Sequence, residues 1–243
     1  MSTAHPHPPA PTGTGSPARP GFIECLLGLI AMVAATAVLP FLGPFGLGLD
    51  EDPVVYGLLV AAWSGVVGLI GFAAAALIRI RSWGAFSVRR TTWRWMALGV
   101  LGGLVALVAK YVLVSAVTMF TDFGDTDPQG MYYDAAGGGA LAGVLTLLFL
   151  AVLTPIGEEF LFRGVITNAL LRHGPLIGVL GGSVIFALAH GINIILPVAI
   201  LVGIIAAELM RRSGSIWPAV AVHAVNNAVL PLLVMVTGYS GPS

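Results

Sequence analysis

Charged residues are scarce in this sequence. Only 9% of its 243 residues are Asp, Glu, Lys or Arg and 57% are hydrophobic, whereas an ordinary soluble domain is about 25% charged. A soluble fold of this length could not bury so much apolar surface, but a lipid bilayer accommodates it. The formal net charge is zero, so the sequence does not show the basic face of a nucleic-acid-binding protein. The composition therefore predicts a membrane protein with no nucleic-acid partner.

Cysteine is almost absent, because Cys25 is the only one in the chain. A disulfide framework needs pairs of cysteines, and a zinc site built on thiolates needs several of them. The sequence therefore excludes an internal disulfide and a cysteine-based metal centre.

The first 20 residues contain almost nothing apolar and are rich in Pro, Gly, Ser and Thr. This composition predicts a disordered, Pro-rich tail over residues 1–21. A cleaved signal peptide is the alternative, because Ala35 and Ala37 resemble a small-residue cleavage site. Against it, Arg19 is the only positive charge before an apolar run that is long enough to span a bilayer. We therefore expect a retained first span.

Long apolar runs make up most of the remaining chain, and a transmembrane helix needs about 20 such residues. We expect spans near residues 22–42, 54–78, 96–120, 138–157, 175–190, 193–210 and 216–237. A further helical stretch at about 158–172 continues from the fourth span. No internal repeat or soluble domain is visible, so the sequence predicts an all-α, polytopic transmembrane helical bundle. It has about seven or eight helices in one transmembrane domain, residues 22–243.

Basic and acidic residues alternate between the loops. Arginines gather after the second, fourth and sixth spans, whereas the loops after the first and third spans hold only acids. The basic positions are Arg79, Arg81, Arg89, Arg90, Arg94, Arg172, Arg211 and Arg212, and the acidic ones are Asp50, Glu51, Asp52, Asp122, Asp125, Asp127 and Asp134. Because Lys and Arg favour the cytoplasmic side, we expect a multi-pass protein of the cell membrane. Its N-terminus would be cytoplasmic and its C-terminus outside.

Two adjacent carboxylates and an arginine lie within the apolar sequence. An ionisable group inside a span costs about 2.5–3.5 kcal/mol, so a functional role is the default hypothesis. Glu159 and Arg163 are four residues apart and share a helix face, where they can pair. Glu158 points about 100° away and is free to face another helix, where a carboxylate in a dry setting suits a general base. The alternative is a structural Glu–Arg pair at a helix junction near Pro155.

Two histidines also lie in apolar helices. His190 ends an apolar run, and the side chains of His223 and Asn227, four residues apart, can converge on one point. The alternatives are a hydrogen-bonded core histidine and polar groups that join neighbouring helices.

A turn at His173-Gly174-Pro175 separates the helix that carries Glu158 from the helix that carries His190. Gly and Pro stand where a helix should stop, with Glu158 16 residues before Gly174 and His190 16 residues after it. An antiparallel hairpin therefore brings Glu158 and His190 to the same level. We expect His223 to join them in a cavity that is reached from the cytoplasmic side.

Three other ionisable residues are explained by their positions. Lys110 lies toward the outer half of the third span and is expected to snorkel outward or to pair locally. Glu208 has Arg212 four residues on and forms a surface pair, and His173 lies at a helix C-terminus, where the helix dipole favours a cation. We exclude them from the candidate site.

The three patterns together resemble the CPBP family of CaaX proteases and bacteriocin-processing enzymes, also called the ABI or type II CaaX prenyl endopeptidase family. The matching residues are an E-E-x-x-x-R-G run at Glu158 to Gly164, an F-x-x-x-H at Phe186 to His190 and an H-x-x-x-N at His223 to Asn227. Each motif is weak alone, but all three occur in the family's order within about residues 138–237. This segment is the expected protease-like core.

The resemblance implies an intramembrane endopeptidase that hydrolyses a membrane-associated or lipophilic polypeptide with a Glu/His-activated water. The resemblance implies that Glu158 and His190 activate the water. It implies that His223 and Asn227 bind the oxyanion of the tetrahedral intermediate. Glu159 and Arg163 would brace the site. The substrate implied is a prenylated tail, or a leader or bacteriocin-like peptide.

A metal is an open alternative within this resemblance. The family is commonly labelled a metalloprotease, and Glu158, His190 and His223 can supply a His₂Glu zinc set with an open fourth position. The chain has no H-E-x-x-H motif, which places two zinc ligands on one helix face. We favour a metal-independent glutamate mechanism over a tightly bound Zn²⁺.

Two other functions use the same buried residues. Intramembrane acids and histidines also form proton relays, so a transporter or proton-coupled channel is one alternative. A non-catalytic immunity or scaffold protein is the other.

Overall fold

The computed structural model describes residues 19–43, 46–121 and 128–239, and the regular secondary structure in these segments is helical. The predicted all-α helical bundle is confirmed. Most of the predicted tail at 1–21, together with Asp122, Asp125 and Asp127, lies outside the described residues.

Within the described residues, five helices are long and apolar enough to cross a membrane. They correspond to five of the predicted spans: Phe22–Leu42, Pro53–Ile80, Trp93–Phe120, Ala140–His173 and Trp217–Thr237. The predicted spans at 175–190 and 193–210 are a shorter apolar helix, Ile177–Ala189, and the more polar helix Leu196–Ser213. The chain is a multi-pass membrane protein.

The elements follow one another along the chain as α1 (Phe22–Thr36), α2 (Leu39–Leu42), α3 (Pro53–Ala75), η1 (Ala76–Ile80), η2 (Trp83–Phe86), α4 (Trp93–Phe120), α5 (Gly130–Gly137), α6 (Ala140–Leu148), η4 (Phe149–Leu153), α7 (Thr154–Glu159), η5 (Phe160–Thr167), α8 (Asn168–Leu170), η6 (Leu171–His173), η7 (Ile177–Gly181), α9 (Gly182–Ala189), α10 (Leu196–Ser213) and α11 (Trp217–Thr237).

The helix Ala140–His173 is continuous, so the junction considered near Pro155 is not a break. Pro155 lies in the first turn of α7, directly after the π-helical segment η4, and a second π-helical segment, η5, follows α7. A π-turn widens the hydrogen-bond pattern and lets a proline lie within a continuous helix. Glu158 and Glu159 are therefore held on a short α-helical segment between two π-helical ones.

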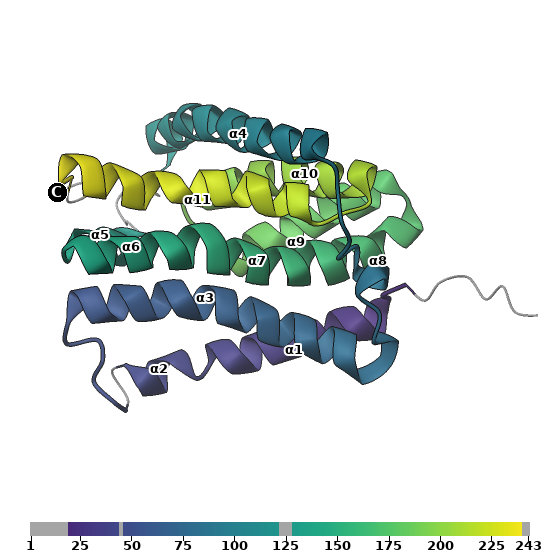
Figure 1. Ribbon diagram of the computed structural model, residues 1–243, viewed down its shortest axis with the longest axis horizontal. Coiled ribbons are helices and arrows are strands. Elements are labelled where there is room, and N and C mark those ends of the chain that lie inside the picture. Colours follow the sequence, from purple (N-terminus) through teal and green to yellow (C-terminus); the bar gives the residue numbers. More distant parts are fainter. Residues whose placement is uncertain (1–18, 44–45, 122–127, 240–243) are drawn as a thin grey trace, which may run out of the picture.

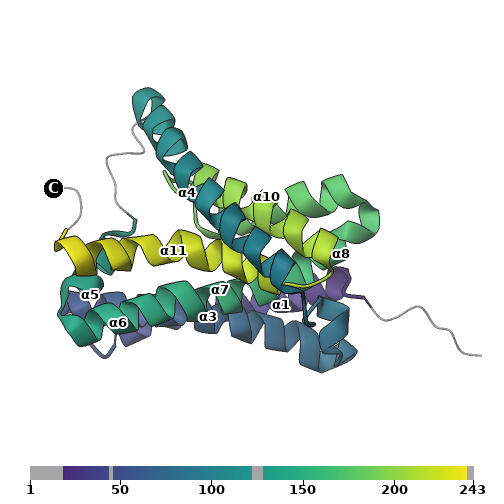
Figure 2. The ribbon, with the colours of Figure 1, turned by 45° about the horizontal axis from the view of Figure 1, so that its top comes forward.

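The helices lie side by side in a bundle. Helix α3 packs between α1 and α7, and α11 packs against α4 on the far side (Figure 1). Helices α9 and α10 form a hairpin that occupies one half of the bundle. Figure 2 shows α4 leaning away from the bundle toward its C-terminal end, where Met119 and Phe120 are 79% and 86% exposed. Such exposed apolar side chains suit a surface that faces lipid.

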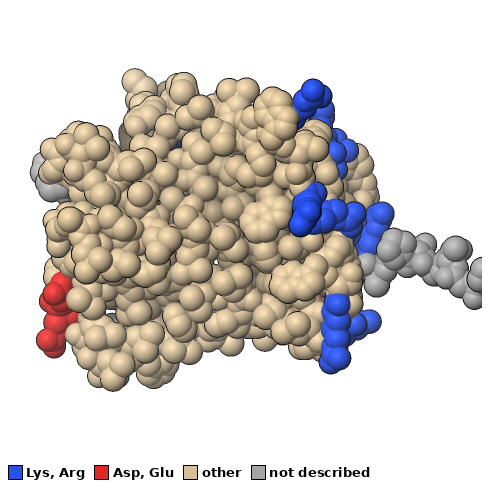
Figure 3. Space-filling model, in the orientation of Figure 1, with Lys and Arg blue, Asp and Glu red and all other residues tan. Residues whose placement is uncertain are grey.

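Charges are segregated to the two ends of the bundle. Figure 3 shows arginines at the end where α1 begins and acidic side chains at the opposite end. We call these the basic end, where α3 ends and α4 begins, and the acidic end, where α3 begins. The predicted orientation requires the basic loops on one side of the membrane and the acidic loops on the other, and the two ends are arranged in this way. Which end faces the cytoplasm stays a prediction.

Glycines allow close contact between α3 and α7. A Cβ atom on Gly157 would overlap the carbonyl oxygen of Gly65, and a Cβ atom on Gly68 would overlap the backbone of Gly157. Small residues let transmembrane helix backbones approach in this way. The contact places Ser64 of α3 beside Glu158 of α7.

We expect Gly157→Ala to destabilise the protein by about 1–3 kcal/mol, because the added methyl group must push two backbones apart. Thermal unfolding in detergent measures the effect. Gly137→Ala is the matched control, since a Cβ atom there meets only Val234 at an ordinary 3.8 Å. Equal unfolding temperatures for the two variants would contradict the close-packing account.

Candidate active site

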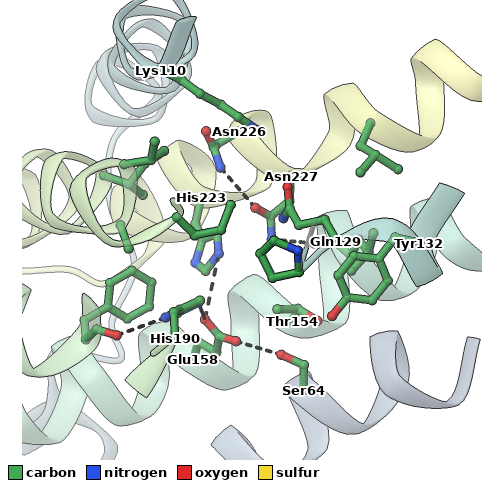
Figure 4. A pocket seen from close by; sticks show the side chains of 18 of the residues that line it. Ser64, Lys110, Gln129, Tyr132, Thr154, Glu158, His190, His223, Asn226 and Asn227 are labelled. Carbon is green, nitrogen blue, oxygen red and sulfur yellow. Dashed lines mark hydrogen bonds and ion pairs between the residues drawn. The ribbon is translucent and has the colours of Figure 1, made fainter. Parts of the chain in front are cut away.

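Glu158 lies at the centre of a group of polar side chains from three helices (Figure 4). Its Oε1 accepts a hydrogen bond from the Ser64 hydroxyl at 2.7 Å. Its Oε2 lies 3.6 Å from His190 Nε2 and 3.9 Å from His223 Nε2, and has no hydrogen-bond donor among the described residues. The structure thus brings together the three residues that the hairpin argument expected to meet.

The orientation of His190 follows from its other ring nitrogen. Nδ1 lies 2.9 Å from the Phe186 carbonyl oxygen, which can only accept, so Nδ1 carries the hydrogen. In the neutral ring, Nε2 then has a free lone pair that faces Glu158. The His190 side chain is 30% exposed and that of Glu158 is 10% exposed, so both reach solvent in the pocket.

His223 is oriented by Glu159. Its Nδ1 lies 2.9 Å from Glu159 Oε1, and Glu159 Oε2 lies 3.0 Å from Arg163 Nε. The predicted Glu159–Arg163 pair is therefore present, and Glu159 has a second partner that the sequence analysis missed. An arginine, a carboxylate and an imidazole form a buried chain that turns His223 Nε2 toward Glu158.

The Phe186 ring covers the guanidinium group of the fully buried Arg163. The guanidinium carbon lies 4.2 Å from the ring centroid, and the two terminal nitrogens have no hydrogen-bond partner among the described residues. A desolvated cation–π contact of this kind contributes about 2 kcal/mol or more. Phe186 also packs edge-on against His190 and His223, at centroid distances of 4.7 and 5.6 Å. The phenylalanine of the F-x-x-x-H motif thus contacts Arg163, His190 and His223.

Asn227 is anchored by an irregularity in the neighbouring helix. The Thr154 N–H bonds to the Phe149 carbonyl in the π pattern of η4, and the next donor in that pattern would be Pro155, which has none. The freed Leu150 carbonyl accepts a hydrogen bond from Asn227 Nδ2 at 3.1 Å. One N–H of the Asn227 amide is therefore used, and the other remains for a ligand.

These residues line a cavity of about 230 Å³. Apolar walls come from residues such as Val198, Val202 and Leu230. Leu230 follows His223 along α11 toward the acidic end, and Gln129 and Tyr132 come from the segment before α6, which begins at that end. The cavity thus extends toward the acidic end. Access to it from the cytoplasmic side stays a prediction.

Several lining residues were not identified from the sequence. Ser64 and Thr154 are polar positions in apolar helices, which is the signal that could have found them, and Lys110, which we had excluded, also lines the pocket near Asn226 (Figure 4). Tyr132 lies outside the membrane-spanning helices. Burial, and secondarily the charge of Glu158, raises the pKa of Tyr132 to about 12, so its phenol stays protonated even in alkaline solution.

The other excluded pair behaves as the sequence predicted. Glu208 contacts Arg212 at 2.5 Å, and it also pairs with Arg211 at 2.7 Å. These side chains belong to the basic end of α10 and do not line the cavity around Glu158.

Glu158, His190 and His223 are the residues that would hold a zinc ion. In the described part of the chain, no three His, Cys, Asp or Glu side chains are grouped as a metal ion would need. Glu158, His190 and His223 are close together, but their arrangement does not by itself build a metal centre.

We expect Arg163→Met to destabilise the protein by about 3–5 kcal/mol, because it leaves the Glu159 carboxylate buried and unpaired. Adding Glu159→Gln should recover part of the loss. Arg212→Gln is the control, since this exposed partner of Glu208 contributes at most about 1 kcal/mol. The free energy of unfolding in mild detergent distinguishes them. Similar losses for Arg163→Met and Arg212→Gln would show that the buried pair is not structurally important.

Comparison with known proteins gives one match. Residues 140–229 match the family described as Type II CAAX prenyl endopeptidase Rce1-like. No curated protein and no solved structure matches the chain. The matched segment contains the whole candidate site except Leu230 and the side chains that α3, α4 and the segment before α6 contribute. This match confirms, over residues 140–229, the resemblance to the CPBP/CAAX protease family that was stated from the sequence.

Proposed function

We propose that this protein is an intramembrane endopeptidase in which Glu158 and His190 activate a water molecule. The observation that carries the proposal is the pair of unused acceptor atoms that face each other across the pocket. Glu158 Oε2 has no donor among the described residues, and His190 Nε2, 3.6 Å away, has a free lone pair. A water placed there donates one hydrogen to each, which directs its oxygen lone pairs into the cavity.

In this mechanism Glu158 accepts a proton from the water as the oxygen adds to the carbonyl carbon of the scissile peptide bond. The same carboxyl group then gives that proton to the leaving amine nitrogen as the carbon–nitrogen bond breaks. Proton transfer of this kind contributes about 10²–10⁴-fold to a rate. The Ser64 hydroxyl holds Oε1 and leaves Oε2 for the reaction.

His223 and Asn227 are the proposed oxyanion donors. Asn227 offers its second amide N–H, and its other N–H is fixed on Leu150. His223 would donate from Nε2, with Nδ1 held by Glu159. Donors that are fixed before the reaction cost no reorganisation when negative charge develops on the carbonyl oxygen. Glu159 and Arg163 act as positioning residues.

The apolar surroundings favour a substrate that reaches the site through the membrane. Val198, Val202 and Leu230 line the cavity beside the polar cluster, and the outer face of the bundle is apolar. We propose a membrane-associated or lipophilic polypeptide as substrate, either prenylated or resembling a leader or bacteriocin peptide. The enzyme would reside in the cell membrane with its basic end in the cytoplasm.

The decisive experiment compares the wild type with Glu158→Gln in detergent, with a polypeptide that accumulates in a deletion strain as substrate. We expect Glu158→Gln and His190→Ala to lower kcat by at least about 100-fold with unchanged folding. Glu208→Gln removes a carboxylate outside the site and should retain activity. Undiminished cleavage by Glu158→Gln would refute the mechanism. Proton-coupled uptake without cleavage by the wild type would favour a transporter, and full biological function of Glu158→Gln would favour a scaffold.

The metal question has its own test. We expect purified active protein to contain well below one zinc per chain and to retain activity after treatment with a chelator. Elemental analysis and activity are measured on the same sample. About one zinc per chain, lost together with activity on chelation and restored with it, would show that the metal-independent mechanism is wrong.

A further inference from the structure

A second cavity lies at the basic end and shares no lining residue with the catalytic pocket. Its volume is about 760 Å³. The walls combine three guanidinium groups with hydroxyl and amide side chains: Arg19, Arg89, Arg211, Ser82, Ser87 and Asn168. Guanidinium groups with hydroxyl and amide donors are the usual partners of phosphate oxygens.

The wall that carries Arg89 is fixed to the rest of the bundle. The Ser87 carbonyl accepts a hydrogen bond from the Ile216 N–H at 3.0 Å, and the Ser215 hydroxyl donates to the Arg89 carbonyl at 2.8 Å. Asn168 Nδ2 donates to the Ser87 hydroxyl at 3.0 Å. The loop between α3 and α4 is therefore attached to both the catalytic helix and the turn before α11. Arg89 emerges from an anchored backbone.

The cavity has an excess of positive charge. Arg211 is neutralised by Glu208, with two nitrogen–oxygen distances of 2.7 Å. Arg89 donates to the Gly84 carbonyl. Neither Arg89 nor Arg19 has a carboxylate partner within the described residues. No carboxylate lines the cavity in that part of the chain. Two guanidinium charges thus remain uncompensated in a built cavity.

The position of the cavity along the membrane-spanning direction indicates where a bound anion would come from. Trp83 in η2 and Trp93 at the start of α4 lie at the same end and are 61% and 75% exposed. Exposed tryptophans at the ends of spans mark the level of the lipid headgroups, and basic pockets between helices at this level bind anionic headgroups.

We propose that this cavity binds the phosphate group of an anionic lipid headgroup, held by Arg19 and Arg89. The site is independent of the proposed peptidase activity. Its occupant would lie against Asn168, five residues beyond Arg163 on the catalytic helix, and would tie that helix to the loop between α3 and α4.

The test compares Arg89→Gln with Arg90→Gln. The two variants remove the same charge from adjacent exposed positions, but only Arg89 lines the cavity. Native mass spectrometry of the purified full chain, titrated with phosphatidylglycerol in detergent, measures the bound lipid. We expect one preferred lipid in the wild type and in Arg90→Gln, and about fivefold weaker binding in Arg89→Gln. Phosphatidylcholine, which carries no net charge, should bind much more weakly to all three proteins.

Inorganic phosphate distinguishes the two sources of the ligand. If the lipid is the ligand, millimolar phosphate should neither displace it nor raise the unfolding temperature. Stabilisation by phosphate alone that is lost in Arg89→Gln would keep the phosphate site but overturn the assignment to a lipid. Equal lipid binding by Arg89→Gln and Arg90→Gln would overturn the site itself and leave a nonspecific attraction to the basic end.

Discussion

The ion pair between Glu159 and Arg163 is the interaction on which the site depends. Both side chains are fully buried, and charges in such a place must compensate each other or the fold loses several kcal/mol. The arginine is also covered by the Phe186 ring and the carboxylate also binds His223. One pair therefore connects the helix Ala140–His173 to α9 and α11 and sets the direction of the His223 imidazole. The same buried ion pair therefore stabilises the fold and orients the site.

Departures from regular helix geometry place the remaining groups. The π-helical segments on either side of α7 let Pro155 lie within a continuous helix, and the carbonyl that this frees at Leu150 holds Asn227. The close contact of Gly65 with Gly157 brings the Ser64 hydroxyl to Glu158. Each irregularity would be costly in isolation, but each is satisfied by a neighbouring helix. Together they form a polar site inside an apolar bundle.

The two cavities differ in the hydrogen-bonding groups that line them. The cavity around Glu158 lies among apolar helices, and the Oε2 atom of Glu158 has no donor among the described residues. The cavity at the basic end has donors in excess and no carboxylate in its described lining. They are joined along one helix, since Asn168 lies ten residues after Glu158. The first arrangement suits proton transfer from water, and the second suits a bound anion.

The sequence by itself determined the fold class, most span positions and the group formed by Glu158, His190 and His223. Hydrophobic length and the Gly174 turn are local signals, and helical spacing fixed which face Glu159 shares with Arg163. Tertiary structure alone decided that Glu159 also orients His223, that Phe186 covers Arg163 and that Lys110 lines the pocket. It also decided that the pocket extends toward the acidic end. These contacts join helices far apart in the chain, and packing between apolar helices depends on shape, which a single sequence does not display.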